Sequence, residues 1–153
     1  MAASIDHIDK SILEILQQDA ATSLDVLSDK VNLSRNAAWR RIKQMEERGI
    51  ITKRVALVNP GAVGCGLTVM VMIKTNQHAA EWLQAFQRTL ATMPEIVGAY
   101  RMTGELDYIL RVRVADVAAY DTFYKRLTSR ISVSDVSASF VMEEIKETTA
   151  VPL

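Results

Sequence analysis

Apolar side chains in the first third of the chain recur at helical spacing in three separate runs. In the third run Ala38, Ile42 and Met45 stand at i, i+4 and i+7, which places them on one helix face. Ser23 and Ser34 precede the second and third runs, where a serine hydroxyl can accept a free backbone N–H of the first turn. The pattern therefore predicts three short helices, in residues 6–18, 24–31 and 34–49.

The segment between the second and third predicted helices is very short. Asn32 is one of the few non-glycine residues that tolerate a left-handed backbone, so it can end a helix tightly, and Leu33 supplies an apolar plug. Gly49 suits the residue after the third helix for the same conformational reason. Two short helices joined by a tight turn form the helix-turn-helix pattern, and a plain helical hairpin is the simpler alternative.

Charge is distributed unevenly, although the net charge of the chain is zero. Residues 1–34 carry two basic and six acidic side chains, whereas residues 35–54 carry seven basic and two acidic ones, which gives +5. Local density sets the potential that a phosphate meets, so this basic stretch indicates nucleic acid despite the neutral total. The alternative is chance clustering on a solvated helix.

The outward face of the third predicted helix carries polar and basic side chains that suit a DNA major groove. Arginine can pair with guanine through two hydrogen bonds and asparagine with adenine, so Asn36 and Arg40 are predicted to read base edges. Trp39 either packs at the edge of the small core or contacts the groove wall. Phosphate contacts or helix bracing are assigned to Arg41, Lys43, Lys53 and Arg54. The full predicted DNA-binding set is Ser34, Arg35, Asn36, Trp39, Arg40, Arg41, Lys43, Lys53 and Arg54.

The pattern changes after a breaker at Asn59-Pro60-Gly61, where the domain boundary is placed. Domain one is residues 1–60, with a strand-like wing at 50–58, and domain two is residues 61–153. In domain two, strands are predicted at 67–75, 96–102, 106–114 and 136–145, and helices at 79–91 and 117–131. The order strand-helix-strand, repeated, predicts an α+β, ferredoxin-like fold. Both helices would cover one sheet face, and the open face would favour dimerisation.

Composition narrows the classes of protein further. The single cysteine, Cys65, leaves no disulfide within the chain and fits a reducing compartment. No apolar run approaches the roughly 20 residues that span a bilayer, and residues 1–10 lack a signal-peptide pattern, so a cytoplasmic location without membrane contact is expected. No metal-ligand spacing occurs.

Several short motifs form an ordered set along almost the whole chain. They are residues 5–13, Gln17-Gln18-Asp19, Leu33-Ser34, Arg40-Arg41-Ile42, residues 46–51, Asn59-Pro60, Gly64, Gly104-Glu105-Leu106-Asp107-Tyr108 and residues 141–146. This set resembles the leucine-responsive and asparagine regulator (Lrp/AsnC) family, also called feast/famine regulators. Arg35, Asn36 and Ala37 replace the prolines and threonine common in the family after the serine cap, and Glu105 replaces the commoner aspartate. The family's usual operator sequence and effector are therefore not assigned to this chain.

The resemblance implies a bacterial or archaeal transcriptional regulator that binds double-stranded DNA and is not an enzyme. It implies homodimers that assemble further, often to octamers, and a small amino acid as effector, with no other cofactor. Residues 120–127 and 135–145 resemble a subgroup linked to cysteine. With the resemblance, the turn at Gly104 is expected to form an amino-acid pocket between subunits, in which Asp107, or else Glu105, takes the ammonium group. The expected pocket residues are Met102, Thr103, Gly104, Glu105, Asp107, Ser137 and Ser139.

Two alternatives remain on the same architecture. Siroheme decarboxylases share the two-domain arrangement, but they would need basic or imidazole residues facing a large tetrapyrrole, and this chain has only His7 and His78. An amino-acid-sensing module without DNA binding is the other alternative, and the +5 stretch argues against it.

Overall fold

The computed structural model describes residues 5–77 and 79–153, so His78 lies outside the described residues. The chain divides into two compact units. The N-terminal unit is Met1–Leu57 together with Lys146–Leu153, and the sheet unit is Val58–Ile145. The predicted boundary after residue 60 lies three residues beyond this division. The last eight residues, which the sequence assigned to the second domain, group with the N-terminal unit.

The described part of the N-terminal unit contains three helices, α1 (His7–Gln18), α2 (Leu24–Lys30) and α3 (Arg35–Glu47). The predicted serine caps are confirmed, because Ser23 Oγ accepts the Val26 N–H at 3.3 Å and Ser34 Oγ accepts the Ala37 N–H at 3.2 Å. The predicted apolar face of the third helix is confirmed, because Ala38, Ile42 and Met45 are buried, and they share the core of this unit with Ile12, Leu13 and Leu27. The narrow apolar face of α3 therefore faces α1 and α2.

The backbone around α3 confirms the predicted turn and helix end. Asn32 has φ +53°, so it supplies the left-handed residue between α2 and α3. Gly49 has φ +69° after α3, and the N–H of Ile50 donates to the carbonyl of Met45 at 2.8 Å. This bond closes the Schellman motif that commonly ends a helix at glycine.

The expected wing strand at residues 50–58 is wrong, although the fold class of the unit is confirmed. Ile50 and Ile51 both donate their N–H groups to Met45 at the end of α3, and residues 52–59 carry no regular secondary structure. Val55 and Leu57 are 57% and 73% exposed. Apolar alternation stabilises a strand only when a partner strand supplies hydrogen bonds, and the described residues supply none here.

In the sheet unit, the residues that the structure describes form four antiparallel strands and two long helices. These are β1 (Leu67–Lys74), α4 (Ala80–Ala91), β2 (Ile96–Arg101), β3 (Tyr108–Val114), α5 (Val117–Arg130) and β4 (Asp135–Phe140), preceded by a 3-10 turn at Gly61–Val63. The strand order β2-β3-β1-β4 confirms the predicted ferredoxin-like arrangement. The last strand ends five residues earlier than predicted, because Phe140 already pairs with Val69 and its partner strand β1 begins only two residues before that, at Leu67.

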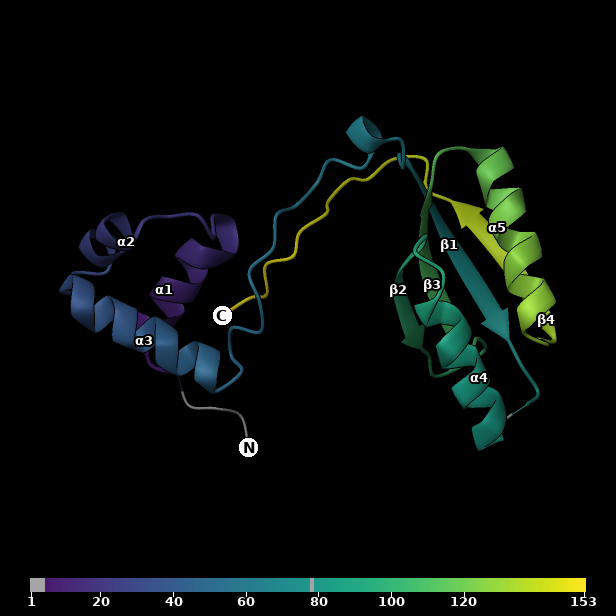
Figure 1. Cartoon of the computed structure of the whole chain (residues 1–153), viewed down its shortest axis with the longest axis horizontal. Helices are drawn as coiled ribbons and strands as arrows, with labels where there is room; N and C mark the ends of the chain where they lie inside the picture. The colour runs from purple at the N-terminus through teal and green to yellow at the C-terminus, as the bar shows by residue number, and fades with distance from the viewer. Residues whose placement is uncertain (1–4, 78) are drawn as a thin grey trace. The chain divides into compact units, whose positions relative to one another are not determined.

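Both helices cover one face of the sheet (Figure 1). Phe86 of α4 and Phe123 of α5 are buried with alternate residues of the two central strands, such as Val71 and Leu110. These two strand residues are also register partners, so their side chains leave the sheet on the same side. The strand residues between them, including Met70 and Arg111, therefore point to the open face.

The open face is more polar than its pattern predicted. Met70, Met72 and Ile109 provide apolar surface in the centre of the sheet, but Arg111 and Arg113 lie beside them on β3. Arg113 forms an ion pair with Glu144 at 3.0 Å, and Glu144 accepts the Thr68 hydroxyl at 2.8 Å. A partner for this face must accordingly match both apolar and charged groups.

Candidate DNA-binding surface

The outward face of α3 presents two side chains that have no partner within the part of the chain that the structure describes. Asn36 and Arg40 are both exposed, one helical turn apart, on the side opposite the buried Ala38, Ile42 and Met45. Because no described residue occupies their hydrogen-bonding groups, both side chains are available to DNA. Both lie on the outward helix face, as the periodicity predicted, and base reading by them stays a prediction.

Arg41 is used inside the protein instead. Its Nη1 donates to Asp6 Oδ2 and to Asp9 Oδ1, at 2.8 Å each. The same two aspartates form the capping box of α1, in which Asp6 Oδ1 accepts the Asp9 N–H at 2.8 Å. That backbone hydrogen bond, with the Arg41 contact second, holds the pKa of Asp6 below 3.8. Of the two predicted roles for Arg41, bracing the helix is the one that the geometry supports.

Replacing Arg41 by methionine is expected to destabilise the N-terminal unit by about 1–3 kcal/mol, because the Asp9 carboxylate stays largely buried without its charged donor. Urea unfolding measures the loss. Arg35→Met is the matched control, since the one ion pair of Arg35 within the described residues is with Asp25 at 3.4 Å and both side chains are well exposed. The pKa of Asp6 is lower in the folded state than in the unfolded state, so its ionised carboxylate stabilises the folded state. This stabilisation is fully present above pH 3.8 and is lost as the pH falls through the pKa of the folded protein. Equal losses in both variants would contradict the bracing role.

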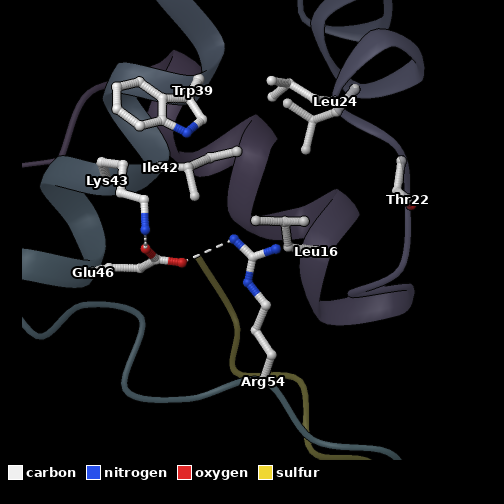
Figure 2. Close-up of a pocket in the computed structure, with 9 residues that line it drawn as sticks. Leu16, Thr22, Leu24, Trp39, Ile42, Lys43, Glu46 and Arg54 are labelled. Carbon is white, nitrogen blue, oxygen red and sulfur yellow. Dashed lines mark hydrogen bonds and ion pairs between the residues drawn. The ribbon is translucent and has the colours of Figure 1, made fainter.

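A cavity of about 310 Å³ opens beside α3 in the N-terminal unit (Figure 2). Apolar side chains from all three helices line it, and charged groups stand at one side. The lining residues are Leu16, Thr22, Leu24, Leu27, Trp39, Ile42, Lys43, Glu46 and Arg54. Trp39 borders this cavity and remains 54% exposed, so it lies at the margin of the core rather than within it.

Two of the predicted phosphate contacts share one carboxylate. Glu46 Oε2 accepts a hydrogen bond from Lys43 Nζ, and Glu46 Oε1 accepts one from Arg54 Nη2, both at 2.9 Å (Figure 2). The hydrogen bond from Lys43 is the main reason why the pKa of Glu46 lies below 4.5. Glu46 was not among the residues predicted from the sequence, although its spacing of three from Lys43 is typical of an ion pair on a helix. Lys53 is exposed and makes no such pair in the described ranges.

The turn between β2 and β3 has the shape expected of a glycine turn. Gly104 has φ +104°, and a side chain added there would meet open space. The carboxylate of Asp107 is partly engaged, because its Oδ2 accepts the Thr75 N–H at 2.8 Å at the end of β1. Glu105 is exposed and has no partner among the residues that the structure describes.

The other predicted effector residues are only partly brought together. Met102 adjoins the turn and donates its N–H to the Asp107 carbonyl at 2.8 Å. Ser137 and Ser139 lie on β4, opposite Met72 and Met70 of β1, so β1 separates them from β3. Adjacent strands are about 4.8 Å apart, so within one chain the serines stand roughly 10 Å from β3, level with Ile109 and Arg111 rather than with the turn.

The described residues contain no group of three or more His, Cys, Asp or Glu that could hold a metal ion. Within the same residues no helix has the length and apolar content that a bilayer crossing needs. Cys65 is partly exposed, and its Sγ lies 3.9 Å from the Val63 carbonyl.

Family models match both parts of this architecture. Residues 5–52 match a winged helix-turn-helix DNA-binding model, and residues 68–151 match the Lrp/AsnC ligand binding domain. The chain belongs to the Lrp/AsnC family. The predicted family, fold class and regulator function are thereby confirmed.

Relatives in the family are similar along their whole length. The chain is 47% identical to the DNA-binding transcriptional activator DecR of Escherichia coli K12, over 97% of this chain and 99% of that protein. It is 43% identical to the glutamate uptake regulatory protein of Zymomonas mobilis, over 100% and 93%. These relatives are transcriptional regulators, which fits a regulator rather than the siroheme-decarboxylase alternative.

Solved structures give the same result. An AsnC family transcriptional regulator from Agrobacterium tumefaciens superposes with a TM-score of 0.94 at 49% identity, covering 97% of both chains. A Neisseria meningitidis transcriptional regulator, solved as a complex with L-methionine, superposes with a TM-score of 0.93 at 33% identity, again over 97% of both chains. The full two-domain fold is therefore shared with these regulators.

Proposed function

We propose that the protein binds operator DNA as a homodimer or larger assembly and that an amino acid bound to the sheet unit modulates this binding. The observation that carries the proposal is the free pair Asn36 and Arg40 on α3, in a family whose models join a DNA-binding and a ligand-binding domain. Such a regulator acts on the chromosome, so we place it in the cytoplasm.

The roles proposed for the DNA-binding residues follow from their surroundings. Asn36 and Arg40 read base edges, while Ser34 caps α3 close to the DNA backbone. Lys53, Lys43 and Arg54 contact phosphates, and Arg35 and Trp39 border the groove. Retention of genomic fragments by the purified full-length protein tests the proposal, and selection of one recurring, roughly palindromic sequence is the expected result. Retention without sequence preference would overturn it.

The dimer is proposed to form through the open face of the sheet. Met70, Met72 and Ile109 form an apolar patch there, and the charged Arg111 and Arg113 lie beside it on the central strand β3. Protein–protein interfaces are enriched in methionine and arginine relative to the rest of the surface, which fits this combination. A two-fold dimer places two copies of α3 on two half-sites, and further assembly to octamers is proposed from the family resemblance.

The amino-acid pocket is proposed at the turn around Gly104, completed by a neighbouring subunit. The open space and positive φ at Gly104 let a ligand approach the backbone, and the free oxygen of Asp107 or the carboxylate of Glu105 takes the ammonium group. Met102 and Thr103 border the pocket, and Ser137 and Ser139 contribute from the last strand. The hydroxyl groups favour a small or polar amino acid, and we propose cysteine first.

Calorimetric titration with the twenty amino acids is expected to give saturable binding for a small number of them, with cysteine and methionine compared directly. Asp107→Asn removes the charge but keeps an oxygen for the Thr75 N–H, so it should weaken binding by about 10-fold or more without unfolding the turn. Gly104→Trp should abolish binding, because bulk and a strained φ are added together. Unchanged binding in both variants would place the effector elsewhere.

A further inference from the structure

The Glu46 carboxylate stands between two cations that are proposed to contact DNA. Lys43 precedes it by less than one helical turn, and Arg54 comes from the irregular segment that follows α3. Each carboxylate oxygen accepts one of them at 2.9 Å, as the dashed lines in Figure 2 mark. The three side chains are partly exposed, at 29% for Glu46, 49% for Lys43 and 43% for Arg54. A phosphate can therefore reach both cations.

An ion pair within the protein competes with an ion pair to DNA. Lys43, Arg54 and Glu46 together carry one net positive charge, so a phosphate near them meets half of the charge that the two cations would supply alone. A cation that moves to a phosphate leaves a carboxylate oxygen without its donor, which offsets part of the gain. Sequence-independent binding consists almost entirely of such phosphate contacts. The ion pairs with Glu46 therefore weaken it more than they weaken binding to the operator.

We propose that Glu46 is a specificity-determining residue, which holds Lys43 and Arg54 away from the phosphates of non-cognate DNA. On the operator, the base contacts of α3 fix the helix in the groove and bring phosphates close enough to displace Glu46. The proposal rests on the assignment of Lys43 and Arg54 as phosphate contacts. Specificity is the difference between the affinity for the operator and the affinity for other DNA. Glu46 increases this difference by lowering the affinity for other DNA.

Two features of the cluster allow the exchange. The carboxylate remains charged at neutral pH, since the pKa of Glu46 is lowered by its hydrogen bond from Lys43. Lys43 is a long side chain on the exposed side of α3, and Arg54 lies in a segment without regular secondary structure. Both cations can therefore change partner by side-chain rotation, without a change in the helix-turn-helix fold.

Binding of the full-length protein to a mixed-sequence DNA duplex, measured by fluorescence anisotropy at several KCl concentrations, tests the proposal. For Glu46→Gln the slope of log K against log salt should steepen by up to about two, at roughly 0.9 per phosphate contact, with affinity near 0.1 M salt rising on the order of tenfold. Preference for the operator fragment selected from genomic DNA over this duplex should fall.

Glu47→Gln is the matched control. Glu47 is the next residue on α3, is exposed, and has no ion pair within the described ranges, so this change alters net charge equally without freeing a cation. Its salt slope is expected to equal that of the natural chain. Adding Lys43→Ala and Arg54→Ala to Glu46→Gln should restore the shallower slope.

Equal slopes for Glu46→Gln and Glu47→Gln would overturn the role of Glu46. The single variants Lys43→Ala and Arg54→Ala then separate the two failures. If each variant lowers the slope of the natural chain by about one, Lys43 and Arg54 contact phosphates but Glu46 does not regulate these contacts. If neither changes the slope, the phosphate contacts fail as well.

Glu46→Asp covers the case in which Glu46→Gln does not fold, as judged by thermal unfolding. Aspartate keeps the charge but is one methylene shorter, so it cannot maintain both 2.9 Å contacts. The slope should steepen by about one contact. A folded Glu46→Asp protein with the slope of the natural chain would reject the proposal.

Discussion

Arg40→Ala is expected to remove operator preference while leaving the fold intact. The Arg40 side chain is exposed and makes no hydrogen bond or ion pair within the described residues, so its loss removes no internal polar interaction. A bidentate arginine–guanine pair is worth about 1–3 kcal/mol of discrimination, and a symmetric dimer loses two such pairs. Specific affinity should therefore fall by about 30-fold or more, since each 1.4 kcal/mol is tenfold.

Competition binding between the operator and a mixed-sequence duplex measures this loss. Arg88→Ala is a matched control, because Arg88 is an exposed arginine of α4 in the sheet unit and its removal changes net charge equally. Lys53→Ala should instead weaken all sequences alike and reduce the salt slope by about one. Unchanged operator preference in Arg40→Ala would refute the assignment of Arg40 to base reading.

Met70→Lys is expected to convert the assembly to monomers of 17.0 kDa. Met70 lies in the middle of β1 on the open face, with Arg111 and Ser139 as its register partners on the two neighbouring strands. A lysine there adds a second positive charge beside Arg111, and a dimer would have to bury both. Separate monomers bind half-sites independently, so operator affinity should fall by about 10²–10⁴-fold through lost avidity.

Light scattering at micromolar concentration measures the oligomeric state of this variant. Gln87→Lys provides the control, because it adds the same charge at an exposed position of α4, on the side of the sheet that the helices already cover. Persistence of the dimer in Met70→Lys would exclude the open face as the interface. A monomer in the natural chain would exclude the dimer model altogether.

The sequence by itself determined the features that depend on near neighbours. Ser34 caps α3, Asn32 takes the left-handed backbone and Gly49 ends the helix, because each of these depends on residues within about five positions. The ferredoxin-like order was also readable, since alternating apolar residues such as Val69 and Val71 define which strand face is buried. The predicted base-reading face of α3 followed from the same helical periodicity.

Only the tertiary structure decided which long side chains meet. Arg41 pairs with residues 35 and 32 positions away, and Asp107 accepts a hydrogen bond from a residue 32 positions away. Long charged side chains have many rotamers, and their partners are selected only when packed elements bring particular groups within reach. For this reason the sequence pattern left two roles open for Arg41, phosphate contact and helix bracing, and it assigned no role to Glu46.

The same reason explains the two larger differences in the backbone. Residues 50–58 alternate like a strand, but no described partner strand supplies the hydrogen bonds that would make them one. The last eight residues group with the N-terminal unit, where Val151 exchanges two hydrogen bonds with the Gln17 amide at 2.7 and 3.2 Å. Local pattern determines what a segment can form, whereas partners distant in sequence, which only the packed chain supplies, decide what it does form.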